Sequence, residues 1–166
     1  MRYAWKRRTN AADVFDTNDR TRAVLERAQV VATRVESGFV DPTHLLLAIL
    51  DEEFTGEPET YRERMIVSLG TTSSALREEL ERSATSRRQP EAAPSGRLEY
   101  TSRALNALRL AMANARRRRE TGGGAPEDVM LAILHDEGSS TWKACARAGI
   151  TKERVADAFE RRQDGE

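Results

Sequence analysis

The sequence contains one cysteine, three lysines and no long apolar stretch. Because Cys145 is alone, an intramolecular disulfide is excluded, and a reducing compartment is the simpler setting. The apolar runs reach six residues, far short of the roughly 20 that a membrane-spanning helix needs. The first residues carry charge but no apolar stretch of signal-peptide length. These absences predict a cytoplasmic protein that does not contact membranes.

The chain also lacks net charge, because its 27 basic and 27 acidic side chains cancel. A balanced total offers no support for bulk attraction to nucleic acid or to an anionic membrane. Charged residues make up 33% and hydrophobic residues 39% of the sequence, which is enough core for a small helical protein with a very polar surface. The length of 166 residues suits one domain, or two small ones that share a core.

Two similar apolar segments are present, DPTHLLLAIL at Asp41–Leu50 and APEDVMLAIL at Ala125–Leu134. Each places a proline where the first residue of a helix would lie, a position that tolerates the missing N–H. The residues that follow are apolar on all sides, and such a helix must be buried. The two segments therefore predict two buried helices in equivalent settings.

The same spacing recurs around these segments. Leu25 and Leu108 occupy matching places on two long amphipathic helices and are 83 residues apart, whereas Leu50 and Leu134 are 84 apart. An offset that changes only at loops is typical of an internal duplication. The first copy carries extra residues around 53–59.

The expected fold is all-α, with two tandem four-helix repeats, about eight helices in all, and pseudo-two-fold symmetry. No stretch alternates well enough for a strand. Glycines at Gly38 and Gly122–Gly124 are expected to end the two long helices. The expected boundaries are a lead-in at 1–17, the first repeat at 18–83, a linker at 84–97, the second repeat at 98–162 and a tail at 163–166.

The repeated motifs resemble those of a known family. They are Tyr100–Ala104, Pro126–Ile133 and Ala148–Ile150 in the second repeat, and Asn18–Arg20, Pro42–Ile49 and Leu69–Thr71 in the first. The order, the spacing and the duplication of these motifs resemble those of the N-terminal domain, or Clp R domain, of ClpA/ClpC-type AAA+ unfoldases. The resemblance spans roughly residues 14–162, nearly all of the chain.

This resemblance implies a module that docks adaptors and substrates. The sequence has no G-x-x-x-x-G-K-[ST] phosphate loop, so no ATPase motor is present. We expect a stand-alone module, because the first repeat has diverged and the tail Arg161–Glu166 is charged. It would be a non-catalytic protein without a cofactor, acting as an adaptor, a competitor or a decoy in Clp-dependent proteolysis. Its expected partners are a Clp ATPase, Clp adaptors or substrates, and Clp-directed cyclic peptide antibiotics.

In some family members each repeat binds phosphoarginine through one carboxylate and one hydroxyl. The matching positions are Thr101 and Glu127 in the second repeat, and Asn18 and Thr43 in the first. A guanidinium favours a carboxylate partner, and a phosphate favours hydroxyls and N–H groups at helix starts. Because Thr43 replaces the carboxylate, the resemblance implies at best one site, in the second repeat. The alternative is that Asn18 and Thr101 merely cap helices and that Glu127 complements a helix dipole.

A basic run, Arg116–Arg119, follows the second long helix. It is either a solvated helix end that complements the dipole or a docking patch for nucleic acid or an acidic partner. The second reading defines our alternative function, a regulator that acts through Arg116, Arg117, Arg118 and Arg119.

The remaining reactive side chains fit structural roles better than chemical ones. His44 begins an apolar helix, where a lone histidine is more often a hydrogen-bonded core residue than a ligand. Cys145 lies on an amphipathic helix and is expected to be a small buried apolar side chain. No residues have metal-ligand spacing, and no nucleophile has a base nearby.

Overall fold

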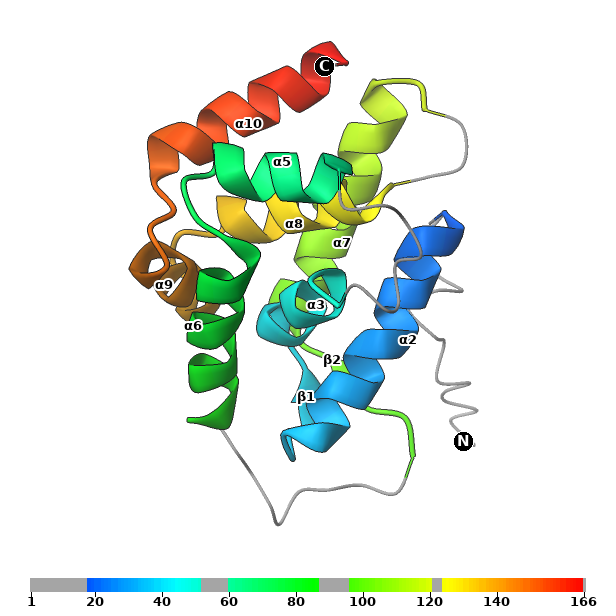
Figure 1. Cartoon of the computed structure of the whole chain (residues 1–166). Helices are drawn as coiled ribbons and strands as arrows, with labels where there is room; N and C mark the ends of the chain where they lie inside the picture. Colours follow the sequence, from blue (N-terminus) through cyan, green and yellow to red (C-terminus); the bar gives the residue numbers. More distant parts are fainter. Residues whose placement is uncertain (1–17, 52–59, 87–95, 121–123, 166) are drawn as a thin grey trace, which may run out of the picture.

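The computed structural model describes residues 18–51, 60–86, 96–120 and 124–165, which form eight helices and two short strands (Figure 1). In chain order the elements are α2 (Asp19–Arg34), β1 (Phe39–Val40), α3 (Pro42–Ile49), α5 (Thr60–Ser68), α6 (Ser73–Thr85), β2 (Glu99–Tyr100), α7 (Ser102–Arg117), α8 (Pro126–His135), α9 (Ser140–Arg147) and α10 (Lys152–Asp164). The predicted all-α class is confirmed. The extra residues expected around 53–59 and the lead-in lie outside the described residues.

The helices pack as a pseudo-two-fold pair of repeats. Helix α2 packs on α3 as α7 packs on α8, and α3 meets α8 at the centre. The last helix of each repeat contacts the third helix of the other, so that α6 packs on α9 and α10 on α5. These exchanged contacts join the two repeats through one core. The repeat boundaries and the linker stay a prediction.

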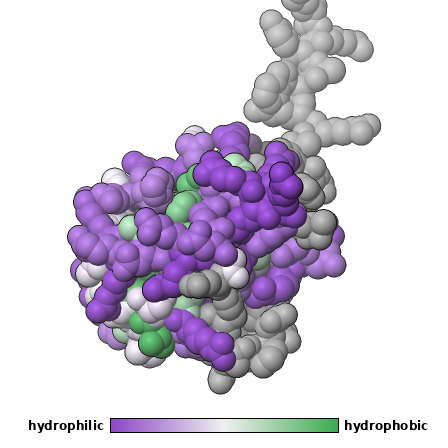
Figure 2. Space-filling model, turned by 90° about the horizontal axis from the view of Figure 1, so that it is seen from above, coloured by the Kyte–Doolittle hydropathy of each residue, from purple (hydrophilic) through white to green (hydrophobic). Residues whose placement is uncertain are grey.

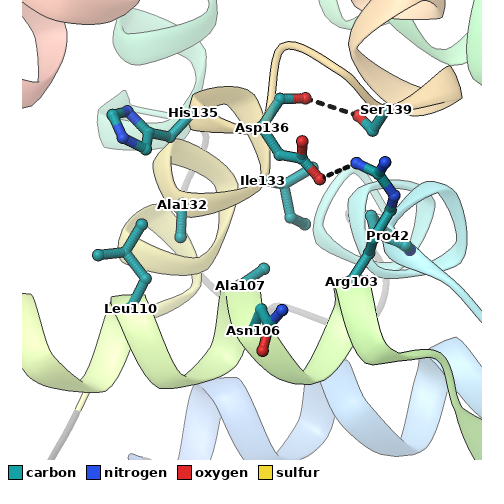
Figure 3. A pocket seen from close by; sticks show the side chains of 10 residues that line it. All are labelled: Pro42, Arg103, Asn106, Ala107, Leu110, Ala132, Ile133, His135, Asp136 and Ser139. Atoms are coloured by element: carbon teal, nitrogen blue, oxygen red, sulfur yellow. Dashed lines mark hydrogen bonds and ion pairs between the residues drawn. The ribbon is translucent and has the colours of Figure 1, made fainter.

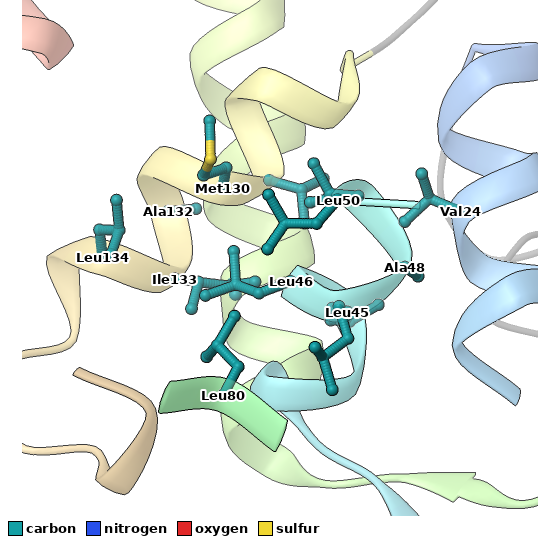
Figure 4. Packing of buried hydrophobic residues seen from close by; sticks show 14 of the residues in the cluster. Val24, Leu45, Leu46, Ala48, Leu50, Leu80, Met130, Ala132, Ile133 and Leu134 are labelled. Atoms are coloured by element: carbon teal, nitrogen blue, oxygen red, sulfur yellow. The ribbon is translucent and has the colours of Figure 1, made fainter. Parts of the chain in front are cut away.

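The core is built on the two apolar helices. All eight residues of α3 are buried, and so are the first nine residues of α8. Leu46 and Met130 come from opposite sides of the centre and are both enclosed (Figure 4). The prediction of two buried helices is thus confirmed. The starts of these short helices then lie where side chains from both repeats can reach them.

Polar side chains begin most helices as the sequence predicts. A side-chain oxygen accepts a hydrogen bond from a first-turn amide in six of the eight described helices. The capping residues are Asn18, Asp41, Thr72, Thr101, Ser139 and Thr151.

The ends of α2 and α7 differ from the prediction. Both helices stop before the glycines at Gly38 and Gly122–Gly124, and the left-handed residues are Glu36 (φ 54°) and Arg119 (φ 58°). These two residues are again 83 apart. In each repeat the next amide bonds back five residues to the helix, which satisfies a carbonyl that would otherwise lack a partner. That gain offsets a left-handed side chain, which costs roughly 1–2 kcal/mol.

The expectation of no strand is wrong at one point. Strands β1 and β2 pair in parallel, with Phe39 opposite Glu99 and Val40 opposite Tyr100. The amide of Thr101 continues the pairing by donating to the Val40 carbonyl at 2.9 Å. Two-residue strands are too short to produce an alternating pattern. They nevertheless hold the start of α7 beside the start of α3.

The surface is predominantly polar. The face shown in Figure 2 is largely hydrophilic, with only small apolar areas. Among the described residues, the large apolar side chains that are exposed are Val30, Phe39 and Val67. None of the described helices has the length and hydropathy to cross a membrane.

The central packing makes a prediction about stability. Leu46→Ala should lower the free energy of unfolding by about 2–5 kcal/mol, because it leaves a cavity where α3 meets α8. Urea denaturation followed by circular dichroism measures the change. Val67→Ala, at a side chain that is 64% exposed, is the control and should stay within about 0.5 kcal/mol. Equal effects of the two substitutions would contradict this view of the core.

Candidate functional site: two helix junctions and a groove

The four residues matched to phosphoarginine binding lie at two junctions between helix starts. In the α2–α8 junction, the Thr21 hydroxyl donates to the Gly124 carbonyl at 2.6 Å, which joins the start of α2 to the start of α8. In the α3–α7 junction, β1 and β2 join the start of α7 to the start of α3. Asn18 and Glu127 therefore belong to the first junction, and Thr43 and Thr101 to the second.

The carboxylate of the α2–α8 junction already binds a guanidinium. Glu127 is 2% exposed, and Arg20 approaches it with Nη2 at 2.7 Å from Oε1 and Nη1 at 3.4 Å from Oε2. This two-point contact is the geometry that a guanidinium ligand would adopt. Asn18 caps α2 through its side chain, which accepts from the Thr21 amide at 2.8 Å. Arg20 of the chain itself thus occupies the place beside Glu127 that the resemblance assigns to a ligand.

The α3–α7 junction has no equivalent carboxylate. Thr43 is fully buried and shares a hydrogen bond of 2.9 Å with the hydroxyl of Thr141. Arg103, which corresponds to Arg20 at the offset of 83, pairs with Asp136 instead. Thr101 caps α7 by accepting from the Ala104 amide at 3.2 Å.

The resemblance grouped Thr101 with Glu127 in one site, but the structure does not bring them into contact. Among the described residues, no hydrogen bond joins the two side chains, and each lies in a junction with a helix of the other repeat. The sequence could not reveal this, because the exchange depends on how the repeats pack. A site at either junction would be composite.

Equivalent residues at the starts of α3 and α8 accept equivalent hydrogen bonds from the backbone. Nδ1 of His44 accepts from the Asp41 amide at 3.0 Å, and the Asp128 carboxylate accepts from the Ala125 amide at 3.0 Å. His44 is 2% exposed. The expectation of a hydrogen-bonded core histidine is confirmed.

The Arg116–Arg119 run divides into one internal and three exposed side chains. The side chain of Arg118 is 6% exposed and bonds to Asp128 at 2.7 Å and to Glu120 at 3.0 Å. Burial alone would lower the pKa of Arg118, but the bonds to Glu120 and the charge of Asp128 raise it. Arg162 of α10 also binds Asp128, at 3.0 Å. Asp128, at the start of α8, therefore ties the end of α7 to α10 through Arg118 and Arg162, and Arg118 is not part of a free basic patch.

A groove that the sequence did not predict lies between α7 and α8. Its volume is about 560 Å³, and Figure 3 shows an apolar floor with polar side chains along the edge. The apolar lining is Pro42, Ala107, Leu110, Ala132 and Ile133, and the polar lining is Arg103, Asn106, His135, Asp136 and Ser139. Pro42 reaches the groove from α3, so the groove adjoins the α3–α7 junction.

The two repeats differ in side chains at this groove. At the established offsets, Leu110 corresponds to Arg27, and His135 corresponds to Asp51. Arg27 and Asp51 form an ion pair of 2.5 Å that joins α2 to the end of α3, with 22% and 14% of their side chains exposed. In the second repeat the same positions hold Leu110 and His135, and leucine cannot form such an ion pair. The His135 ring stacks instead on the ring of Phe159, with 6.3 Å between the ring centroids. An aligned comparison of the two repeats would have pointed to this difference.

A comparison with protein-family models identifies the family. The model of the Clp repeat (R) N-terminal domain matches residues 16–142. The chain belongs to the Clp N-terminal domain family. No protein of curated function matches its sequence closely enough to count as a relative.

Solved structures share the fold. The Hsp104 N-terminal domain from Candida albicans has a TM-score of 0.72 at 15% identity, covering 91% of this chain and 93% of that domain. A structure from preliminary investigations of a malarial protein secretion system has a TM-score of 0.70 at 15% identity, covering 90% and 95%. At this identity the likeness concerns the fold alone. It agrees with the Clp N-domain architecture expected from the sequence.

The ion pair of the α2–α8 junction predicts that two arginines of α2 contribute differently to the free energy of unfolding. Arg20→Gln should lower the free energy of unfolding by about 1–3 kcal/mol, because it leaves the buried Glu127 carboxylate without its charged partner. Arg22→Gln is the matched control, since its partner Asp19 is exposed, and it should cost at most about 0.5 kcal/mol. Chemical denaturation compares the two. Similar losses in both variants would contradict a structural role for the Arg20–Glu127 pair.

The burial of Cys145 leads to a second prediction, about the reactivity of its thiol. It is fully buried, and burial raises the pKa of its thiol to about 12. Because the thiolate is the reactive form, a chromogenic disulfide reagent at pH 8 should leave the folded protein unmodified. The same reagent should titrate one thiol when denaturant is added. Rapid reaction of the folded protein would show that Cys145 is accessible.

Proposed function

We propose that this chain is a non-catalytic, cytoplasmic docking module that binds a polypeptide partner in Clp-dependent proteolysis. The family to which it belongs supports this proposal, because Clp N domains serve as docking modules for substrates and adaptors. No described group of three His, Cys, Asp or Glu residues could hold a metal ion, and the proposal requires none. The groove between α7 and α8 is the docking surface that we propose.

The chemistry of the groove suits an extended polypeptide. Its apolar floor can accept aliphatic side chains, and its volume is within the range of ligand pockets. Arg103 and Asp136 are 53% and 42% exposed, and such an exposed pair costs little to separate. Once separated, the two side chains supply a donor and an acceptor for peptide groups. The observation that carries the proposal is that Leu110 and His135 stand here in place of the Arg27–Asp51 ion pair.

Three roles are compatible with such a module, and a reconstituted degradation reaction separates them. An adaptor should accelerate degradation of a Clp substrate by a Clp ATPase and its protease. A competitor should slow it. A decoy should leave the rate of degradation unchanged in the absence of antibiotic. When a Clp-directed cyclic peptide antibiotic impairs degradation, the decoy should restore the rate.

Phosphoarginine is a second candidate ligand, because Glu127 already holds a guanidinium in two-point contact. The ligand would displace Arg20 and direct its phosphate to the start of α2 near Asn18. Free phosphoarginine should then shift the NMR signals of Asn18 and Glu127, but not that of Thr101, and Glu127→Gln should abolish the response. Arg20→Gln should strengthen binding, because it vacates the carboxylate. No shift at Asn18 or Glu127 would exclude this ligand.

The nucleic-acid alternative is less well supported. With Arg118 held by Asp128 and Glu120, the run presents only its other three arginines. Absence of binding to nucleic acid at low salt, where phosphate contacts are strongest, would remove this alternative.

The groove proposal predicts a matched pair of variants on α7. Leu110→Asp should weaken binding of a fluorescently labelled, permanently unfolded Clp substrate by about tenfold, because it places a charge on the apolar floor. Leu105 is also partly buried on α7 but does not line the groove, so Leu105→Asp is the control. Fluorescence anisotropy measures the affinity, and circular dichroism confirms that both variants are folded. If the two variants bind equally well, docking does not use this groove.

A further inference from the structure

A second cavity lies between the repeats, where the last turns of α6 face α9. Its volume is about 360 Å³, and every residue that lines it carries a positive charge or a hydroxyl group. The lining residues are Arg82, Ser83, Ser86, Ser140, Lys143 and Arg147. We call it the α6–α9 cleft. No carboxylate and no apolar side chain lines it, which distinguishes it from the groove.

The cations of the cleft are only partly neutralised. Glu79 accepts from Nε of Arg147 at 2.8 Å and also pairs with Arg82. The bond from Arg147 lowers the pKa of Glu79, so this carboxylate is ionised at neutral pH and holds both arginines in place. Glu78 supplies Arg82 with a second partner at 2.9 Å. Lys143 forms no ion pair with any described residue, so three cations meet two carboxylates and one positive charge remains.

Hydrogen-bond donors complete the cleft. The hydroxyl of Ser140 has no partner among the described residues, and the two terminal nitrogens of Arg147 make no bond to them either. Ser140 and Lys143 are three residues apart on α9, so their side chains lie on the same face of the helix. A tetrahedral oxyanion is the ligand class that uses hydroxyl, ammonium and guanidinium donors together.

We propose that the α6–α9 cleft binds a phosphate group. The phosphate has two sources, the free anion or a phosphorylated side chain of a polypeptide docked in the groove. Position favours the second source, because Ser139 lines the groove and the next residue, Ser140, lines the cleft. The second source rests on the proposed docking function, whereas phosphate binding itself does not.

The first test is a titration of the full chain with inorganic phosphate, followed by NMR. The amide signals of Ser83, Ser140 and Lys143 should shift and saturate. Lys143→Gln should weaken binding by about three- to tenfold, the effect of losing one charged hydrogen bond at an exposed site. Lys152→Gln removes the same charge from α10 and should leave the affinity unchanged. Shifts that do not saturate, or equal affinities in both variants, would overturn the proposal.

The second test separates the sources by comparing one serine-containing Clp substrate peptide in phosphorylated and unphosphorylated forms. Tighter binding of the phosphopeptide than of inorganic phosphate, reduced by both Lys143→Gln and Leu110→Asp, supports a polypeptide-borne phosphate. Binding of inorganic phosphate that equals or exceeds that of the phosphopeptide overturns this source. The two proposals can fail separately, because Lys143→Gln should not affect the unphosphorylated peptide and Leu110→Asp should not affect inorganic phosphate.

Discussion

The burial of α3 against α8 is the interaction on which the rest of the structure depends. Each helix is too short to be stable alone and apolar on every side, so each requires a complete shell of neighbours. The shell of α3 includes helices of the second repeat, and that of α8 includes helices of the first. Neither repeat can therefore bury its own central helix completely. The exchange of contacts between repeats follows from this requirement.

That exchange also decides what can become a site. The starts of the central helices emerge at composite junctions, and one residue at each junction determines its character. Where Glu127 is present, Arg20 turns inward and neutralises it. Where Thr43 is present instead, Arg103 pairs with Asp136 and lines the groove. This one difference between corresponding positions of the two repeats thus accompanies a closed junction on one side and an arginine at a groove on the other.

Much of the fold could be predicted from the sequence, because it depends on local patterns. Apolar periodicity, Asp41 and Thr101 as caps, and the offset between Leu25 and Leu108 all follow from neighbours along the chain. Errors arose where backbone hydrogen bonds, which the pattern of side chains does not encode, set the local structure. Glu36 takes the left-handed position because the next amide bonds back to the helix, and β1 forms only because β2 lies beside it.

The sequence by itself determined the helices, their duplication and the family, since each is encoded in residue spacing. Only the tertiary structure decided which helix starts meet, and so separated Thr101 from Glu127 and paired Glu127 with Arg20. It also brought Arg82 of α6 to Lys143 of α9, and Leu110 of α7 to Ile133 of α8. Such contacts depend on how two buried helices cross, and a spacing of residues along one chain carries no record of that crossing.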